Sequence, residues 1–361
     1  MRKNIFATTP GIIIVGAVIG LIAVWLQKLG NPANMGICVA CFERDVAGGL
    51  GLHRAAIVQY LRPEIMGLVL GSLAAAISTR EFKPRGGSAP IVRFVLGMIA
   101  AMGALVFLGC PWRAILRLAG GDGNAILGLA GLATGIWFGT LFFKKGYSLG
   151  RSNSQSVVSG ALFPVIAVCL LLLYLIFPQI PDQPQSGPLF YSVKGPGSQH
   201  APFLASLGLA FLLGLFAPRS RFCTMGAFRD LFLFRYTHLF LGLAAMFAAA
   251  FIANALTGGL KFGFEGQPVA HSDFLWNYLG MVTAGLAFAL AGGCPGRQLF
   301  MAGEGDSDAG IFALGMLVGA AIAHNPGTAS SGTGIGVYGM QATIIGFAVC
   351  LIIGFVHSKK A

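Results

Sequence analysis

The chain has 361 residues, of which 56% are hydrophobic and only 10% are charged, and its mean hydropathy is +0.78. Soluble domains carry about 25% charged residues, so this composition excludes a soluble globular protein. The formal net charge of +12 occurs without a long basic run that contains aromatic residues, so we expect no nucleic-acid partner.

Apolar stretches long enough to cross about 30 Å of hydrocarbon recur along the chain. Hydropathy predicts ten spans, at 10–26, 64–79, 91–109, 124–143, 157–177, 202–217, 237–257, 275–293, 309–323 and 338–357. Four segments between them are too short or too polar to cross and are predicted as re-entrant half-helices, at 36–50, 111–119, 222–235 and 295–303. The sequence therefore predicts an all-α polytopic membrane protein surrounded by lipid.

Lysines and arginines are distributed unevenly between the two sides of the predicted membrane. Most of the 24 fall in segments on the same side as the termini, such as 144–151 and 219–235. The long loop 178–201 on the other side contains only Lys194. By the positive-inside rule, both termini are predicted to be cytoplasmic in a bacterial inner membrane, and much of the net charge reflects this orientation.

Two short blocks of reactive and charged residues each occur twice, in the same order and at nearly the same spacing. The block Cys38–Asp45 recurs as Cys223–Asp230, with cysteine, arginine and aspartate at matching positions. The block Gly109–Arg113, which reads Gly-Cys-Pro-Trp-Arg, recurs as Gly293–Arg297, which reads Gly-Cys-Pro-Gly-Arg. Such matches are improbable by chance in a chain with so few cysteines and charges, so we infer an internal duplication.

The duplication defines a domain organisation. We expect a first membrane repeat at 8–143, a linking span and outer loop at 144–199, a second repeat at 200–323, and a final span with a cytoplasmic tail at 324–361. Each repeat contains four predicted spans and two half-helices. Because five spans precede the second repeat, it is expected to be inverted, with a pseudo-twofold axis in the membrane plane.

The Gly-Cys-Pro motifs predict a chemical site. Proline lacks an N–H and suits the first helical turn, so Cys110 and Cys294 are each expected at the N-terminus of a short helix, where anions are attracted. Arg113 and Arg297, three residues further on, would add a cation one turn deeper. The alternative is that each cysteine packs as a small hydrophobe, which its recurrence in both halves makes less favoured.

Inversion would place one group of thiols toward each mouth of a path through the membrane. The candidate path residues are Cys38, Cys41, Cys110, Arg113, Cys223, Cys294 and Arg297. A thiol is a weak donor that suits a soft, polarisable anion and releases it again, which favours transport over catalysis. The alternative is a membrane thiol carrier that transfers sulfur or selenium covalently to a cytoplasmic acceptor.

Other polar and reactive residues receive structural interpretations. Cys38 and Cys41 form a Cys-x2-Cys pair, but no second ligand pair follows, so neither a metal nor a cofactor is predicted. The neighbouring arginine and aspartate of each first block are expected to brace the short helices, because isolated charges are costly in a membrane. Trp112 stands where the second half has Gly296, and it either narrows one mouth or packs, with packing favoured.

The motifs quoted above, together with Met35–Cys38 and Gly292–Arg297, resemble those of the YeeE/YedE sulphur-transport membrane family, especially its YedE-type branch connected with selenium. The resemblance implies an hourglass-shaped inverted repeat in which thiosulfate passes inward through transient contacts with cysteines in a constriction. Cys110 and Cys294 match those positions best. It also implies a soluble sulfur carrier of the TusA or YedF type as a cytoplasmic partner. No residue type here distinguishes sulfur from selenium anions.

Overall fold

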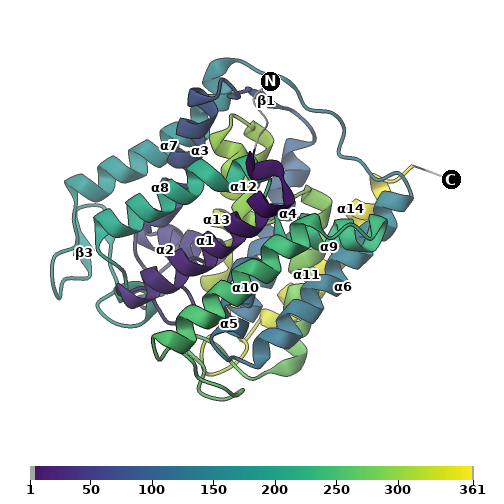
Figure 1. Ribbon diagram of the computed structural model, residues 1–361. Coiled ribbons are helices and arrows are strands. Elements are labelled where there is room, and N and C mark those ends of the chain that lie inside the picture. Colours follow the sequence, from purple (N-terminus) through teal and green to yellow (C-terminus); the bar gives the residue numbers. More distant parts are fainter. Residues whose placement is uncertain (1–4, 360–361) are drawn as a thin grey trace.

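The computed structural model describes residues 5–359, and within this range the chain is mostly helical with two small two-stranded sheets. Figure 1 shows the helices bundled side by side. In chain order the elements are η1 (Ile5–Ala7), α1 (Thr9–Lys28), α2 (Val39–Gly49), α3 (Pro63–Ser78), β1 (Arg85–Gly86), α4 (Pro90–Phe107), α5 (Pro111–Ala119), α6 (Asn124–Lys144), β2 (Asn153–Ser154), α7 (Val157–Ile176), β3 (Gln185–Ser186), β4 (Leu189–Phe190), η2 (Pro196–Ser198), α8 (Phe203–Ser220), α9 (Thr224–Phe234), α10 (His238–Leu256), α11 (Phe274–Ala291), α12 (Pro295–Gly303), α13 (Ser307–His324) and α14 (Gly339–Val356).

Nine helical segments in residues 5–359 are long and apolar enough to cross a membrane. Three of them join a long helix to the short helix that follows it, namely α4 with α5, α8 with α9 and α11 with α12. All ten predicted spans are helices, but α3 has only 16 residues and is about 24 Å long at 1.5 Å per residue, so it falls short of a full crossing. The predicted all-α polytopic architecture is confirmed.

The four predicted half-helices also occur as short helices. They are α2, α5, α9 and α12, and each has between 9 and 11 residues. Each begins directly after a cysteine, and α5 and α12 carry proline in the first turn. Proline at this position costs no hydrogen bond, because the first N–H groups of a helix have no partner within it.

The long helices pack in reciprocal pairs. Helix α6 packs along α11 while α13 packs along α4, and α3 packs along α8 while α10 packs along α1. Helices α4 and α11 also contact each other, at the centre of the molecule. If α1–α6 are matched in order with α8–α13, each pairing maps onto another pairing in this set. Helices α7 and α14 lie outside this scheme, because α7 packs on α3 and α14 packs on α11 and α4.

Glycine allows the central pair of helices to approach closely. A Cβ added at Gly103 on α4 would lie 2.7 Å from the carbonyl oxygen of Gly280 on α11, and a Cβ at Gly280 would lie 2.9 Å from the oxygen of Gly103. The two backbones are therefore in contact at this point, as small residues permit in membrane helices.

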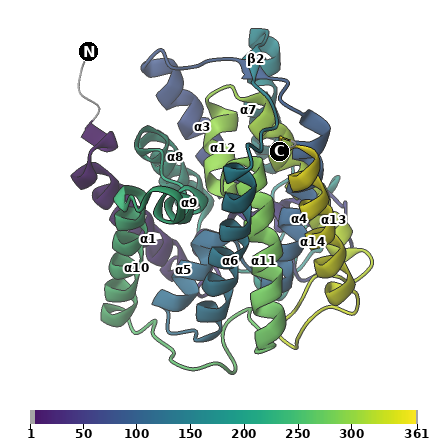
Figure 2. The ribbon, with the colours of Figure 1, turned by 90° about the vertical axis from the view of Figure 1, so that its right-hand side faces the viewer.

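The described chain begins and ends on the same side of the helix bundle, as Figure 2 shows. On this side the start of α1 meets the start of α10, where Thr9 Oγ1 lies 3.3 Å from His238 Nδ1. The ends of α6 and α14 also meet there, where the Lys359 N–H donates to the Lys145 carbonyl at 3.2 Å. We call this side the termini face, and the positive-inside rule predicts that it is cytoplasmic.

Candidate functional site

The short helices α2 and α5 both begin beside the sulfur atom of Cys38. Cys38 is the N-cap of α2, and its Sγ accepts hydrogen bonds from the backbone N–H of Cys41 at 3.4 Å and of Cys110 at 3.5 Å. Cys110 is itself the N-cap of α5. Its thiol is close enough to that of Cys38 to interact with it. We call Cys38 and Cys110 the first thiol pair, and both are at most 1% exposed.

The same arrangement occurs at the start of the other two short helices. Cys223 is the N-cap of α9, and its Sγ accepts from the N–H of Gly226 at 3.3 Å and of Cys294 at 3.4 Å. Cys294 is the N-cap of α12, and the two thiols interact. We call these residues the second thiol pair. Both pairs therefore lie at converging helix N-termini, where the partial positive charge favours anions.

The chain turns sharply into each Cys-Pro step. Leu108 is the C-cap of α4 and Gly292 is the C-cap of α11, and both residues have left-handed backbone conformations, with φ of 63° and 87°. Such a residue is a common helix terminator. The reversal carries the next cysteine to the start of the following short helix, so the turn positions each thiol pair.

The two arginines predicted to follow the thiols have different surroundings. Arg113 is fully buried, and its Nη1 lies 3.5 Å from the Cys41 sulfur. Its remaining contacts are to main-chain oxygens of four residues: Asn34, Leu108, Pro268 and Val269. Arg113 therefore joins the α1–α2, α4–α5 and α10–α11 connections, and it brings Cys41 beside the first thiol pair.

Arg297 is partly exposed, with 16% of its side-chain area accessible. Its Nη1 donates to the Pro218 carbonyl at 3.4 Å, and its Nη2 lies 3.6 Å from Glu304 Oε2. Arg85 approaches the same oxygen at 4.0 Å, so the two arginines reach Glu304 from different segments. With only one weak carbonyl contact, the Arg297 guanidinium retains donors for an anion.

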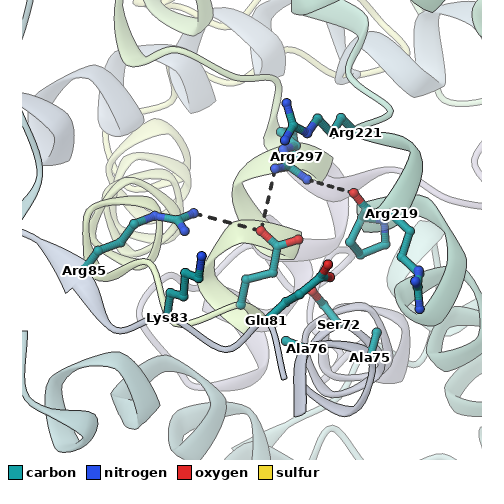
Figure 3. Close-up of a pocket in the computed structure, with 11 residues that line it drawn as sticks. Ser72, Ala75, Ala76, Glu81, Lys83, Arg85, Arg219, Arg221 and Arg297 are labelled. Carbon is teal, nitrogen blue, oxygen red and sulfur yellow. Dashed lines mark hydrogen bonds and ion pairs between the residues drawn. The ribbon is translucent and has the colours of Figure 1, made fainter. Parts of the chain in front are cut away.

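Arg297 lines two adjoining cavities on the termini face, of about 380 and 520 Å³. They share Arg219 and Arg221 as well, and we call them together the basic vestibule. Figure 3 shows the lining of the smaller cavity. Cys223 lines the larger cavity and is 6% exposed. The remaining charged or titratable residues of the lining are Glu81, Lys83, Arg85, Arg229, Asp230, Tyr236, His238 and Glu304. The second thiol pair thus borders a water-accessible space with excess positive charge.

Comparison with known proteins agrees with this geometry. The model of a family described as "Sulphur transport" matches residues 219–354, a stretch that holds the second thiol pair and much of the basic vestibule. The "Probable transporter YedE" of Escherichia coli (strain K12) is 26% identical over 280 residues, which cover 72% of this chain and 63% of that protein. The chain is thus similar to members of the YeeE/YedE sulphur-transport family.

A second relative from the same organism is the "Thiosulfate transporter TsuA", which is 28% identical over 123 residues, or 34% of each chain. The matched stretches thus span less than two thirds of the length of either curated relative. The family resemblance predicted from the cysteine motifs is confirmed.

Paired charges hold the short helices α2 and α9 in place. Asp45 on α2 accepts from Arg44 at 2.7 Å and from Arg62 at 2.7 Å, and all three are buried. On α9, Arg229 pairs with Asp230 at 2.7 Å. Buried charges are costly unless they are paired, so these contacts fit the bracing role predicted for the first block.

The cysteines outside the pairs do not join the site. Cys169 is exposed on α7 and Cys350 is buried in α14, and neither contacts a paired thiol through a hydrogen bond described here. Within residues 5–359, no group of three or more His, Cys, Asp or Glu side chains is arranged to hold a metal ion.

The basic vestibule was not predicted from the sequence. Its arginines come from Arg85, from 219–229 and from Arg297, which are far apart along the chain. The Arg-Ser-Arg run two residues before Cys223 was the available signal, but it was interpreted only as part of the charge bias that sets orientation. No sequence pattern indicated a role for Glu304, because its ion pair with Arg85 forms only where the end of α12 approaches the α3–α4 connection.

Proposed function

We propose that the protein carries a small sulfur- or selenium-containing anion of the thiosulfate type across the membrane, through transient contacts with the two thiol pairs. The observation that carries this proposal is their matched geometry. In each pair, one cysteine sulfur caps a short helix and accepts the N–H of the second cysteine, at 3.5 Å in the first pair and 3.4 Å in the second. A single packing cysteine gives no reason for such repetition.

The chemistry of each pair suits brief binding. Two helix N-termini converge there and provide positive potential without a fixed counterion. A thiol S–H can donate a weak hydrogen bond to the terminal sulfur or selenium of the anion, and a weak bond is released quickly. Two weak sites in succession allow throughput, whereas one tight site would hold the anion.

The two thiol pairs differ in their exposure, and this difference gives the proposed path a direction. The first pair is buried, with 0% and 1% exposure, while Cys223 of the second pair lines the basic vestibule. An anion at the second pair can therefore exchange with the vestibule. If the termini face is cytoplasmic, as the charge distribution predicts, import ends with release into the vestibule.

The reciprocal helix pairing supports the inverted duplication that the path requires. We propose that the repeats at 8–143 and 200–323 each supply one thiol pair, with 144–199 and 324–361 as the linking and final segments. The loops support the same relation: Arg85 N–H donates to the Gly305 carbonyl and Gly263 N–H to that of Gly121, both at 3.1 Å. Inverted repeats of this kind place a binding site at their interface.

A soluble sulfur carrier of the TusA or YedF type is the proposed partner on the termini face. The basic vestibule leads from Cys223 of the second thiol pair to that face. A carrier with an acidic rim would complement its arginines and receive the anion as it leaves. Loss of carrier binding when Arg219 and Arg221 are changed to glutamate would support this, and unchanged binding would reject it.

Uptake into proteoliposomes tests the proposed function. Purified protein should take up radiolabelled thiosulfate, and unlabelled selenite or selenosulfate should compete, whereas phosphate should not, because it presents no soft atom to a thiol. The rank order of competitors identifies the substrate. No uptake of any chalcogen anion, or equal competition by phosphate, would contradict the proposal.

Intact mass measured after substrate exposure separates transport from covalent transfer. Transient contacts predict unmodified thiols during active flux. A stable gain of one sulfur or selenium mass would instead favour the membrane thiol carrier.

A further inference from the structure

The two Gly-Cys-Pro-x-Arg motifs differ at one position, and the two residues there are in contact. Trp112 on the first turn of α5 is 1% exposed, and its ring lies against Gly296 on the first turn of α12. A Cβ added at Gly296 would lie 2.6 Å from Cη2 of Trp112. The indole therefore occupies the space that a side chain at the matching position would need, which explains why that position is glycine.

Trp112 also connects the surroundings of the two thiol pairs. It follows Cys110 by two residues, and Gly296 follows Cys294 by two residues. Its ring centroid lies 6.0 Å from that of Phe222, the residue before Cys223, and 6.0 Å from that of Phe300 on α12. The side chain thus extends from the first pair into an aromatic cluster beside the second pair.

The indole nitrogen is the unusual feature of this cluster. Nε1 of Trp112 is buried and has no hydrogen-bond partner within residues 5–359. Buried tryptophan normally finds a partner for this N–H, because an unsatisfied donor costs free energy. A tryptophan that served only for packing could be replaced by phenylalanine, which fills nearly the same space without a donor.

We propose that Trp112 closes the path between the two thiol pairs and that its N–H donates a hydrogen bond to the anion during passage. This inference rests on the proposed function. The aromatic cluster excludes water and hydrated ions, as apolar constrictions do in channels. An anion that enters this constriction must lose its bound water. The hydrogen bond from the indole N–H and the contacts with the thiols on either side then replace that water.

Thiol labelling tests the closure without depending on transport. A small anionic methanethiosulfonate reagent is applied to inside-out membrane vesicles, and labelling of each cysteine is followed by peptide mass spectrometry. Cys223, which lines the vestibule, reports access from that side. Trp112→Ala should increase the rate at Cys110 on the order of tenfold, because the apolar constriction is removed. The rate at Cys223 should stay unchanged.

Flux measurements test the hydrogen bond. Trp112→Phe should keep Cys110 protected yet lower thiosulfate flux about fivefold, the equivalent of one net hydrogen bond of about 1 kcal/mol. Trp137→Phe on the exposed face of α6 is the matched control and should change neither quantity. If Trp112→Ala does not fold, Gly296→Ala provides a second test, because its Cβ displaces the indole and should raise the labelling rate at Cys110.

The outcomes separate the two proposals. Unchanged labelling of Cys110 in Trp112→Ala, or unchanged flux in Trp112→Phe, would overturn the role of Trp112 even if thiosulfate is transported. If the unmodified protein carries no anion, the proposed function fails, while the labelling experiment still decides whether the indole separates the pairs.

Discussion

Glu304 lies among the arginines of the basic vestibule and can change their charge. Burial raises the pKa of its carboxyl above the ordinary value, an effect opposed by Arg297 and Arg85 and supported by Glu81 and Asp306. A raised pKa means that the carboxylate gains its proton at a higher pH than an exposed glutamate does. Below that pH Arg297 loses this charged partner and becomes available to an anion, whereas Arg85 keeps its ion pair with Asp306 at 2.7 Å.

Anion binding at the vestibule should therefore strengthen as the pH falls through the raised pKa of Glu304. Glu304→Gln should bind thiosulfate at neutral pH as the unmodified protein does in mild acid, because its side chain carries no charge at either pH. Calorimetry at several pH values measures this. Glu265→Gln is the control on the opposite face. A variant at Glu304 that keeps the original pH dependence would disprove the role of this carboxyl.

Arg113 and Arg297 occupy matching positions in the sequence but should respond differently to the same substitution. Arg113→Lys loses most of the contacts to carbonyl oxygens, which lysine cannot reproduce, and should cost about 2–4 kcal/mol of stability. Arg297→Lys should leave the melting temperature nearly unchanged and weaken thiosulfate binding. Thermal unfolding and binding, measured on both variants, check this. If Arg113→Lys and Arg297→Lys lowered the stability equally, the difference in burial between the two arginines would not explain their roles.

At the scale of the helices, the sulfur atoms that cap α2 and α9 are also ones that we propose contact the anion. Cys223 starts α9 by accepting the Gly226 N–H at 3.3 Å, as a serine oxygen does at many helix starts. The short helices are therefore held by the residues proposed to contact the anion. A variant must keep the cap to show what the thiol itself contributes.

Cys223→Ser and Cys223→Ala together separate the two roles. Serine is a good N-cap, so its variant should keep the stability of the unmodified protein, whereas alanine should lose about 1 kcal/mol. Both should lose thiosulfate flux, because neither offers a soft sulfur atom. Thermal unfolding and uptake measure these effects. Full flux in the serine variant would show that any hydroxyl-sized donor is sufficient.

The helices were largely predictable, while the contacts of their side chains were not. Apolar length located the ten spans, and proline after Cys110 and Cys294 located the starts of α5 and α12. The different surroundings of Arg113 and Arg297 depend on the connection before α11, whose Pro268 and Val269 carbonyls cover only Arg113. Spacing within a motif carries no information about a loop that folds over it from elsewhere in the chain.

At the scale of the whole molecule, the reciprocal pairs of helices surround one central contact between α4 and α11. The loops follow the same pattern, since Gly121 and Gly305 have φ values of 96° and 97°. The symmetry is broken where Trp112 meets Gly296, and where the basic vestibule opens beside only the second thiol pair. This arrangement is consistent with the proposed single path with two unlike ends, along which the thiol pairs would act in series.

Uptake of radiolabelled thiosulfate by single and double cysteine variants tests this account most directly. Proteoliposomes carrying Cys110→Ala, Cys294→Ala or both are compared with the unmodified protein and with Cys169→Ala, a cysteine outside the pairs. Because the pairs act in series, each single variant should lower uptake close to background, the double variant should be no lower, and Cys169→Ala should match the unmodified protein. Undiminished uptake in the double variant would contradict conduction by way of the paired thiols.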